Sequence, residues 1–463
     1  MGSCCWDNRQ MSWYKLFSMK LLQIASGDFF STYGGGQVYV KNLVDELIRQ
    51  GADVVVFSFV DKDITIAQHI YNGIPLYEIG CQAQNSDIEN LVRTIAPDII
   101  HVHSQKALFA SLGRRLSIPV IITAHHGGIL CPAGTLMNAE DSICQTTLSH
   151  RNCLKCCLAN IRTGCAWYPF MRLLPEVMYR SLGRKLAKLP FVPFITPIGG
   201  VAKSIEDKIA EWQSIYSNAS MVIAPSHAIA EAMCRNGLSR AKVRVIPHGI
   251  PGEFNVKSLT LSENENTKHE RSASLNTKQE QSEQPIRFFF LGRICRVKGL
   301  HVLLEAFDDE CFSNNAELHI IGGTGNKGEQ RYMQRLQRKY RNPNIVWHGK
   351  VPSDKVLETI CEFDIMVHPT MYLEIFGLNI SESLLMHKPV LATRCGGAEM
   401  QIRDGENGWL VEPSNAIALR EKMYQIVRDG INLDMNALSS GVISIEEHVK
   451  ELISLYEETT CID

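Results

Sequence analysis

Residues 367–409, which read VHPTMYLEIFGLNISESLLMHKPVLATRCGGAEMQIRDGENGW, carry the strongest signal for a fold in this chain. An apolar run at 363–368, bounded by charge and proline, leads into this stretch and is typical of a buried strand. A loop and a helix over 378–387 follow, and Pro389 stops the helix because proline cannot continue it. A second strand is predicted at 390–393, and two glycines after it open another loop. The order strand, loop, helix and strand predicts an α/β unit.

Two carboxylates frame the first loop and its helix: Glu374 precedes the turn, and Glu382 lies inside the helix. Between them, Phe376, Gly377 and Leu378 form the helix start, where unpaired N–H groups and the positive end of the helix dipole suit a phosphate. Glycine at 377 lets the backbone approach the anion closely. Glu382 is placed to accept hydrogen bonds from ribose hydroxyls, and Glu374 from a second polyol. The pattern predicts a pocket for a diphosphate between hydroxyl-rich rings; the alternative is two solvated glutamates that favour the dipole.

The spacing of these two glutamates resembles the E-x7-E signature of glycosyltransferase family 4, a group of retaining enzymes. The resemblance implies an α/β structure of the GT-B type, with two facing Rossmann-like domains and a cleft between them. It implies a hexosyltransferase that moves a sugar from a nucleotide-diphosphate donor to a saccharide or lipid-linked acceptor. Cell-envelope or exopolysaccharide biosynthesis is the expected context.

Length and composition agree with a globular protein of two domains. The chain has 463 residues, and 45% of them are hydrophobic while 21% are charged. A formal net charge of −2 gives no general attraction to nucleic acid. No apolar run approaches the roughly 20 residues of a membrane-spanning helix, and residues 1–20 lack the apolar core of a secretory signal. We therefore expect a cytoplasmic protein, or one bound peripherally to the inner face of a membrane.

Composition also predicts the domain boundaries. Residues 1–18 read as a disordered or spurious extension, and 19–254 as an acceptor-side Rossmann-like domain. Residues 255–285 are almost free of apolar side chains and predict a disordered linker or insertion. The donor-binding domain is predicted at 286–443, and a helix at 444–463 is expected to cross back to the first domain.

In the first predicted domain, a strand at 20–25 is followed by a glycine-rich loop and a helix, the order in which a βαβ unit binds phosphates. By the family resemblance, Gly34 and Gly35 of this loop lie under the donor diphosphate. The resemblance also assigns contact with the transferred sugar to His125 rather than His126, at the end of another predicted strand. The alternative is a histidine that caps a loop.

In the second predicted domain, Arg293 and Lys298 follow a strand at 286–291. Arginine offers a planar fork for phosphate and lysine a point charge. The resemblance assigns both to the leaving diphosphate. It also places Lys350 and Val351 near the nucleotide base, and Gly323, in a close-backbone turn after a strand at 318–321, is a further candidate for donor binding.

Two other functions remain open at this point. A nucleotide-sugar epimerase or a phosphorylase of similar architecture would also bind a phosphate between two domains, although no clear pyridoxal-bearing lysine is apparent. A non-catalytic nucleotide-sugar binding protein is the third reading, and the presence of Glu374, Arg293 and Lys298 argues against it.

A cysteine-rich insertion at 130–166 predicts a structural metal site rather than disulfides in a reducing compartment. Its four candidate ligands are Cys131, Cys144, Cys153 and Cys156, and Cys157 or Cys165 could replace one of them. Four sulfurs suit a structural zinc ion or an iron–sulfur cluster. Reduced, partly buried thiols are the alternative. No cofactor is expected to be required for catalysis.

Residues 170–191 mix apolar side chains with five cations and few acids. Such a segment is a candidate for peripheral contact with an anionic membrane or a lipid-linked acceptor. Pro175 and Gly183 interrupt it, so an ordinary solvated helix face is the alternative.

Overall fold

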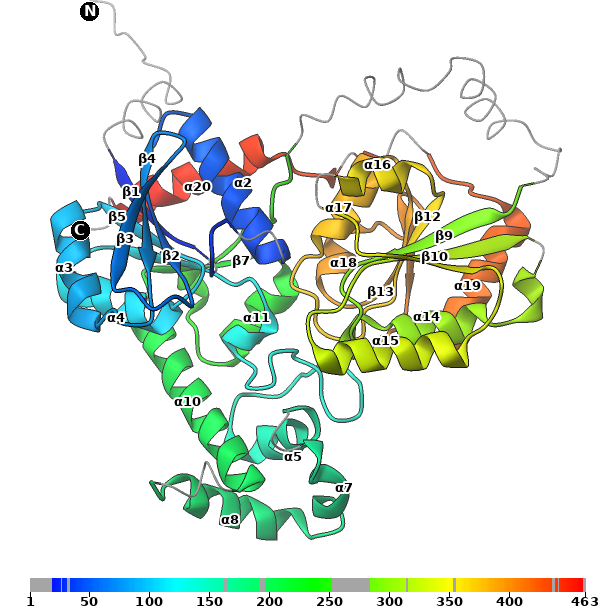
Figure 1. The fold of residues 1–463 in the computed structure, drawn as a ribbon, viewed down its shortest axis with the longest axis horizontal. Helices are drawn as coiled ribbons and strands as arrows, with labels where there is room; N and C mark the ends of the chain where they lie inside the picture. Colours follow the sequence, from blue (N-terminus) through cyan, green and yellow to red (C-terminus); the bar gives the residue numbers. More distant parts are fainter. Residues whose placement is uncertain are drawn as a thin grey trace, which may run out of the picture. The chain divides into compact units, whose positions relative to one another are not determined.

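The computed structural model describes residues 19–25, 27–30, 34–161, 165–190, 196–251, 284–313, 315–352, 355–434, 438–439 and 441–460. The predicted extension at 1–18 and nearly all of the predicted linker at 255–285 lie outside these residues. The chain forms two compact units, each built on its own β-sheet (Figure 1). The first unit comprises Met1–Ala139, Cys144–Pro251 and Ile443–Asp463, and the second comprises Glu140–Ile143 and Gly252–Val442.

The first unit contains an eight-stranded sheet in the order β3-β4-β2-β1-β5-β6-β7-β8. Its strands are β1 (Lys20–Ile24), β2 (Asp53–Phe59), β3 (Ile66–Tyr71), β4 (Ile74–Ile79), β5 (Ile99–Val102), β6 (Val120–Thr123), β7 (Met221–Ala224) and β8 (Val243–Val245). Neighbouring strands are parallel except for the β3–β4 hairpin. The central strands are almost entirely buried, as expected for a parallel sheet that helices cover on both faces.

The helices of this unit include the C-terminal helix of the chain. They are α2 (Gly35–Arg49), α3 (Asn85–Ile95), α4 (Lys106–Leu116), α5 (His150–Asn160), α7 (Tyr168–Met171), α8 (Glu176–Ala187), α10 (Pro197–Asn218), α11 (His227–Arg235) and α20 (Ile445–Thr460). The returning chain is fixed after β8, where Ile250 N–H donates to Ile443 O at 3.0 Å and Ile445 N–H donates to Ile250 O at 2.8 Å. Helix α20 then packs against α2. Within the described part of the chain, no helix is long and apolar enough to cross a membrane.

The second unit contains six parallel strands in the order β11-β10-β9-β12-β13-β14. They are β9 (Ile286–Leu291), β10 (Ala316–Ile321), β11 (Ile345–Gly349), β12 (Ile365–His368), β13 (Val390–Thr393) and β14 (Gly408–Val411). The helices are α14 (Leu300–Phe307), α15 (Lys327–Lys339), α16 (Val356–Cys361), α17 (Leu378–Leu385), α18 (Gly397–Gln401) and α19 (Ala416–Asp429). Alternation of strand and helix gives both units the α/β class that the sequence predicts.

Four residues of the cysteine-rich insertion, Glu140–Ile143, belong to the second unit, whereas the sequence placed them in the first domain. Arg296 pairs with the Asp141 carboxylate at 2.7 Å, and the Ser414 hydroxyl donates to the Asp141 carbonyl at 2.8 Å. Ile143 packs against the core of the second unit. These contacts join residues far apart in the sequence, so local patterns could not reveal them.

Each sheet has one position where the strand order reverses. In the first unit β1 lies between β2 and β5, and in the second β9 lies between β10 and β12. Successive connections leave such a position in opposite directions, which opens a crevice at the carboxyl ends of the strands, where α/β proteins bind ligands. We therefore expect functional side chains at the carboxyl ends of β1, β5, β9 and β12.

Several predicted elements differ from the structure. The loop predicted after the double glycine contains α18, because the Glu399 carboxylate accepts from the Gly396 N–H at 2.9 Å and caps a short helix. The β3–β4 hairpin was not predicted, since its exposed edge strand lacks a continuous apolar run.

Candidate functional site

The strongest polar feature of the second unit is an ion pair between Lys298 and Glu374. Lys298 ends the loop after β9, and Glu374 lies in the loop after β12, so the pair spans the point where the strand order reverses. Glu374 is buried, with 7% of its surface exposed. The structure thus excludes the reading of Glu374 as a solvated surface residue.

The environment of this pair keeps both groups charged. The Tyr372 hydroxyl lies 3.0 Å from both carboxylate oxygens of Glu374, and the Lys298 ammonium is 5.2 Å from the centre of the Tyr372 ring. Burial opposes both charges, yet the ion pair raises the pKa of Lys298 and lowers that of Glu374 relative to their ordinary values. A fixed positive charge is therefore present at the carboxyl end of the sheet.

A neutral histidine completes the environment of Glu374. Burial lowers the pKa of His368 to about 3, with Lys298 adding to the shift. Asn379 Nδ2 lies 3.4 Å from His368 Nδ1, which assigns the ring proton to Nε2. His368 Nε2 is 3.7 Å from Glu374 Oε2 and is buried without a hydrogen-bond partner. The loop after β12 thus offers an unused donor beside the carboxylate.

Backbone contacts hold the loops of Lys298 and Glu374 together. The Met371 N–H donates to Val297 O at 2.9 Å, and the Glu374 N–H donates to Cys395 O at 2.8 Å. Gly299 has a φ of +72°, and a Cβ built at this position would lie 1.8 Å from Pro369 O. Only glycine allows so close an approach, so the ion pair rests on a glycine one residue away.

The start of α17 lies beside this pair. Gly377 adopts a φ of +86° before the first turn, and no side chain caps that turn. Phe376 is buried, whereas Gly377 and Leu378 are half-buried. Gln401 Nε2 donates to Gly377 O at 3.3 Å, which helps to hold the backbone at the start of the helix. The first N–H groups of α17 are thus left for an outside acceptor, as a phosphate site requires.

Glu382, one turn into α17, differs from Glu374 in having no cation beside it. It is half-buried, and burial alone raises its pKa to about 7. Hydrogen-bond donors that reach such a carboxyl group stabilise its charged form and lower its pKa. Such an environment suits an acceptor for vicinal hydroxyls.

The other predicted donor residues of the second unit are more exposed. Arg293 pairs with Glu329 at 2.6 Å and does not share the Lys298 pair, so a phosphate at Arg293 would have to compete with Glu329. Gly323 follows β10, and a Cβ there would lie 3.1 Å from the Lys350 side chain. Lys350 is exposed, while Val351 is half-buried and packs against the core. All four residues lie in loops after β9, β10 or β11.

In the first unit, Gly34 and Gly35 form the start of α2. Gly34 is the residue before the helix, no side chain caps the first turn, and the turn contains no acid. Both glycines are exposed. This helix start therefore also presents backbone N–H groups outward, and its contact with a phosphate stays a prediction.

His125 follows β6 and lies in a cluster of aromatic rings. Its ring centre is 5.2 Å from that of Tyr39, 5.0 Å from that of His103 and 5.5 Å from that of His248. Burial lowers the pKa of His125 well below its ordinary value, so the ring is neutral at pH 7. His126 instead caps the next turn, where its Nδ1 accepts from the Gly128 N–H at 3.0 Å. The two adjacent histidines thus have different environments, since His125 lies among aromatic rings and His126 caps a turn.

A hydrogen-bonded chain behind His125 fixes its tautomer. His103 Nε2 lies 3.1 Å from Gln23 Oε1, so this nitrogen carries the proton of the neutral His103 ring. His103 Nδ1 must then accept from His125 Nε2, 2.8 Å away. The chain continues from Gln23 through the Tyr456 hydroxyl of α20 to His101. The remaining lone pair of His125 is thereby placed on Nδ1, which makes that atom a hydrogen-bond acceptor.

The cysteine cluster is only partly assembled as a metal site. Burial raises the pKa of Cys153 to about 11 and that of Cys156 to about 12, and the thiols of Cys131 and Cys144 add to both shifts. The four thiols thus share one neighbourhood in the first unit. Cys156 Sγ lies 3.3 Å from Met137 O, however, and among the described residues no three His, Cys, Asp or Glu side chains form a metal-binding group.

A structural zinc ion or iron–sulfur cluster at these thiols stays a prediction. Metal analysis of the purified wild-type chain should find a stoichiometric metal, and the Cys153→Ser variant should lose it together with part of the stability of the insertion. The prediction would be contradicted if the purified wild-type protein contained no metal and its insertion were nevertheless stably folded.

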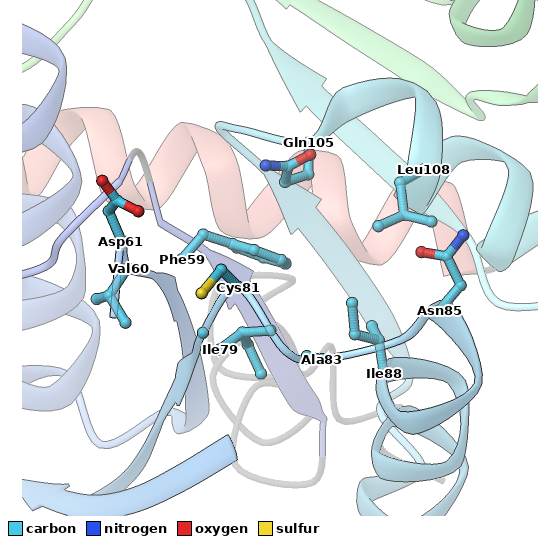
Figure 2. A pocket seen from close by; sticks show the side chains of 11 residues that line it. Phe59, Val60, Asp61, Ile79, Cys81, Ala83, Asn85, Ile88, Gln105 and Leu108 are labelled. Atoms are coloured by element: carbon cyan, nitrogen blue, oxygen red, sulfur yellow. The ribbon is translucent and has the colours of Figure 1, made fainter. Parts of the chain in front are cut away.

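A pocket of about 410 Å³ lies elsewhere in the first unit, at the carboxyl ends of β2 and β4 (Figure 2). Phe59, Cys81, Asn85 and Gln105 are among the residues that line it. It contains none of the predicted site residues.

Sequence reasoning missed several residues of the site. Tyr372 and His368 flank Glu374, and His103 and Tyr456 support His125. His368 ends the apolar run that is predicted as a strand, which was a usable signal, because residues at that edge face the crevice. Tyr456 belongs to a helix more than 300 residues away from its partner His101, and no local signal marks it.

Comparison with known proteins agrees with this geometry. The family model described as Glycosyltransferase Family 4 matches residues 33–141 and 196–254, and the one described as Glycosyl transferases group 1 matches 273–441. The phosphatidylinositol N-acetylglucosaminyltransferase GPI3 subunit of Saccharomyces cerevisiae is 22% identical over 383 residues, which cover 80% of this chain and 67% of the yeast protein.

Two solved structures share the fold. Sucrose-phosphate synthase from Thermosynechococcus elongatus superposes with a TM-score of 0.63 and 18% identity, covering 96% of this chain and 100% of that one. Anabaena HepE in complex with UDP and glucose superposes with a TM-score of 0.59 and 17% identity, covering 95% and 99%. These likenesses show the two-domain α/β fold of GT-B type that the sequence predicted.

Proposed function

Because this chain belongs to glycosyltransferase family 4, we propose that it transfers a hexose from a nucleoside-diphosphate sugar with retention of configuration at the anomeric carbon. The buried ion pair of Lys298 and Glu374, at the sheet position where ligands bind and beside an uncapped helix start, is the observation that carries the proposal. HepE was solved with UDP and glucose, which supports a nucleotide-sugar donor here.

Charge at the leaving diphosphate is the main catalytic contribution in this proposal. Lys298 is held charged by Glu374, and the first N–H groups of α17 are uncapped. Both would stabilise the negative charge that develops as the bond to the sugar breaks, with no rearrangement at that moment. Arg293 would add to this after exchanging Glu329 for a phosphate oxygen. The chain's own cations thus supply this charge in the proposed reaction.

The donor sugar and ribose are assigned to the two glutamates. A carboxylate has about four acceptor sites, so Glu374 retains capacity beyond Lys298 and Tyr372 for a sugar hydroxyl. Glu382 accepts the ribose hydroxyls, and His125, neutral with an acceptor at Nδ1, accepts a hydroxyl of the transferred sugar. Attack from the same face as the departing diphosphate, through an oxocarbenium-like state, accounts for retention.

The acceptor in this proposal is a saccharide or a lipid-linked saccharide of cell-envelope or exopolysaccharide biosynthesis. The yeast relative is named for phosphatidylinositol, a membrane lipid, which supports the lipid-linked class.

The proposal is tested by adding nucleoside diphosphates one at a time to the purified chain. One of them should raise the melting temperature, because binding to the folded state stabilises it by mass action. The matching nucleotide sugar should release free nucleotide when an acceptor is added. Stabilisation by none of them would contradict the donor assignment, and acceptor-independent release would contradict transfer.

Glu382 makes nucleotide binding depend on pH. Its pKa of about 7 in the free protein should fall when ribose hydroxyls donate to it, so binding should release a proton. Affinity of the wild type should therefore weaken from about pH 8 to about pH 6 more steeply than affinity of Glu382→Gln, which should bind roughly tenfold more weakly at pH 8. Calorimetry in buffers of different ionisation enthalpy measures the released proton.

Glu382→Gln also controls for titration of the nucleotide itself, since the terminal phosphate of the ligand titrates equally with both proteins. Without ligand, the raised pKa means that the stability contributed by protonated Glu382 is present below pH 4.5 and is lost as the pH rises through about 7. Glu382→Gln should not show this loss. Parallel pH profiles of affinity for the two proteins would contradict the ribose assignment.

His103 should act on turnover through His125. In His103→Leu the His125 Nε2–H loses its acceptor, and the proton is free to move to Nδ1, where the sugar hydroxyl should bind. We expect kcat to fall by about tenfold with little change in the donor KM, a typical cost of one misplaced hydrogen bond. His103→Asn keeps an acceptor near the position of Nδ1 and should restore most of the rate. Equal rates in the two variants would show a merely structural role.

A further inference from the structure

The described part of the chain concentrates its exposed apolar side chains in one short segment. Thirteen large apolar side chains are exposed among these residues, and eight of them lie between residues 167 and 189. The exposed fraction reaches 77% at Leu173, 74% at Val177 and 68% at Phe170. We call this segment, with α7, the turn after it and α8, the α7–α8 surface.

The core of the first unit does not account for these exposed side chains. Helix α8 packs its other face, with Tyr179 and Gly183 buried, against α5 and α10. A Cβ on Gly183 would already lie 3.0 Å from Ile198, so this contact is close-packed. Figure 1 shows α5, α7 and α8 together at one end of the long helix α10, away from the sheet of this unit. Within the described part of the chain, the outward face of α7 and α8 therefore packs against no other element.

The charges on this face are almost all positive. Between residues 165 and 190 the sequence has five cations and a single acid, Glu176, which pairs with Arg180. The other four cations are exposed: Arg172, Arg184, Lys185 and Lys188. In α8, Lys185 lies one helical turn from Leu182 and two turns from Met178, so a cation and apolar side chains share one face. The whole chain, by contrast, has a formal net charge of −2.

We propose that the α7–α8 surface binds a bilayer that contains anionic phospholipid. Exposed aromatic and aliphatic side chains insert at the boundary of headgroups and acyl chains, while lysine and arginine stay at the anionic headgroups. Trp167 is half exposed, and tryptophan favours this boundary. A protein partner fits less well, because lysine is depleted from the cores of protein interfaces. The inference deepens the proposed function, since a lipid-linked acceptor resides in a membrane.

Vesicle binding by the full chain tests the proposal. The wild type should sediment with vesicles of phosphatidylcholine and phosphatidylglycerol, remain largely free with phosphatidylcholine alone, and dissociate at high salt. The triple variant Phe170→Ser/Leu173→Ser/Val177→Ser should bind about tenfold or more weakly, because each substitution removes exposed apolar surface from the contact. Charge reversal in Arg184→Glu/Lys185→Glu/Lys188→Glu should remove the preference for anionic vesicles.

The control for loss of exposed apolar surface substitutes two similarly exposed residues that lie outside the α7–α8 surface. Ile70 and Ile417 are 68% and 65% exposed, and Ile70→Ser/Ile417→Ser should bind vesicles like the wild type. A blue shift of tryptophan fluorescence on vesicle binding, lost in Trp167→Phe, would locate the contact independently. The proposal fails if the wild type stays free of anionic vesicles or if the triple variant binds as well as the wild type. It also fails if the triple substitution converts a wild-type dimer into a monomer, which would assign the face to a second copy.

Vesicle binding and nucleotide binding are separate readouts. Stabilisation by a nucleoside diphosphate should be the same in the wild type and the triple variant, because the substituted residues belong to the first compact unit, whereas Lys298 and α17 belong to the second. Vesicle binding without nucleotide stabilisation would refute the proposed donor and leave the membrane surface standing; the reverse result would refute the membrane surface alone.

Discussion

Replacing Lys298 with alanine should nearly abolish sugar transfer and destabilise the fold at the same time. Loss of the positive charge at the leaving diphosphate should lower kcat by about 10³-fold, as for other groups that stabilise developing charge. Glu374 would also be left buried without its cation, and breaking a buried ion pair in this way costs about 3–5 kcal/mol. From the sequence alone we would expect an effect on turnover with little effect on folding; the burial of Glu374 changes that expectation.

A double variant separates the two effects. Lys298→Met/Glu374→Gln removes both charges at similar volume, so most of the lost stability should return while turnover stays lost. Denaturant unfolding and nucleotide release measure the two quantities. Turnover of the double variant at the wild-type rate would contradict the role of Lys298.

The pH dependence of stability gives a second check on the ion pair. In the wild type the pKa of Glu374 lies below its ordinary value, so the stability from the pair is present above that value and is lost as the pH falls through the folded pKa. In Lys298→Ala, burial of the lone carboxyl group should raise its pKa, so the variant is least stable at neutral pH. The difference between the two proteins should shrink as the pH falls towards 4.5. A difference independent of pH would point to packing rather than charge.

Substitution of Gly299 with alanine should have the second largest effect. The residue has a φ of +72°, and its Cβ would lie 1.8 Å from Pro369 O, so the loops that hold Lys298 and Glu374 would have to separate. Strain and displacement together should lower the free energy of unfolding by about 3–5 kcal/mol. Turnover should fall as well, because the ammonium group of Lys298 moves relative to the start of α17.

Gly405 provides the matched control for this substitution. It lies in the same unit with a φ of +83°, but a Cβ there would meet no atom within 4 Å. Gly405→Ala should therefore show only the cost of the left-handed backbone, about 1–2 kcal/mol, with turnover unchanged. Equal destabilisation by the two substitutions in denaturant unfolding would show that the contact with Pro369 does not matter.

The regular elements of the fold were predictable wherever apolar runs are short and continuous. β9 and β13 have the bounds that the sequence predicts, because the apolar runs of these buried parallel strands are nearly continuous. Prediction was weaker where polar residues decide the structure. The short helix α18 depends on a cap from Glu399, and the β3–β4 hairpin has an exposed edge.

The candidate site was predictable as a set of residues but not as a set of contacts. Sequence spacing indicated Glu374, Glu382 and the start of α17, and the resemblance indicated Lys298 and His125. The sequence did not reveal that Arg293 and Lys298 have different partners, Glu329 and Glu374. Nor did it reveal the chain from His125 to α20. These pairings depend on which loops meet at the end of a sheet.

By itself the sequence determined the α/β class, the family and the side-chain types at the candidate site, because apolar periodicity and motif spacing are local properties. Only the tertiary structure decided which buried groups are charged and which apolar side chains remain exposed. Lys298 and Glu374 are 76 residues apart in the sequence, and their pairing in the folded chain keeps both of them ionised although burial opposes each charge. The α7–α8 surface follows the same logic: the sequence gives its apolar residues and cations, but packing against α5 and α10 decides which of them remain outside. Desolvation and exposure belong to the folded chain, and no local pattern contains them.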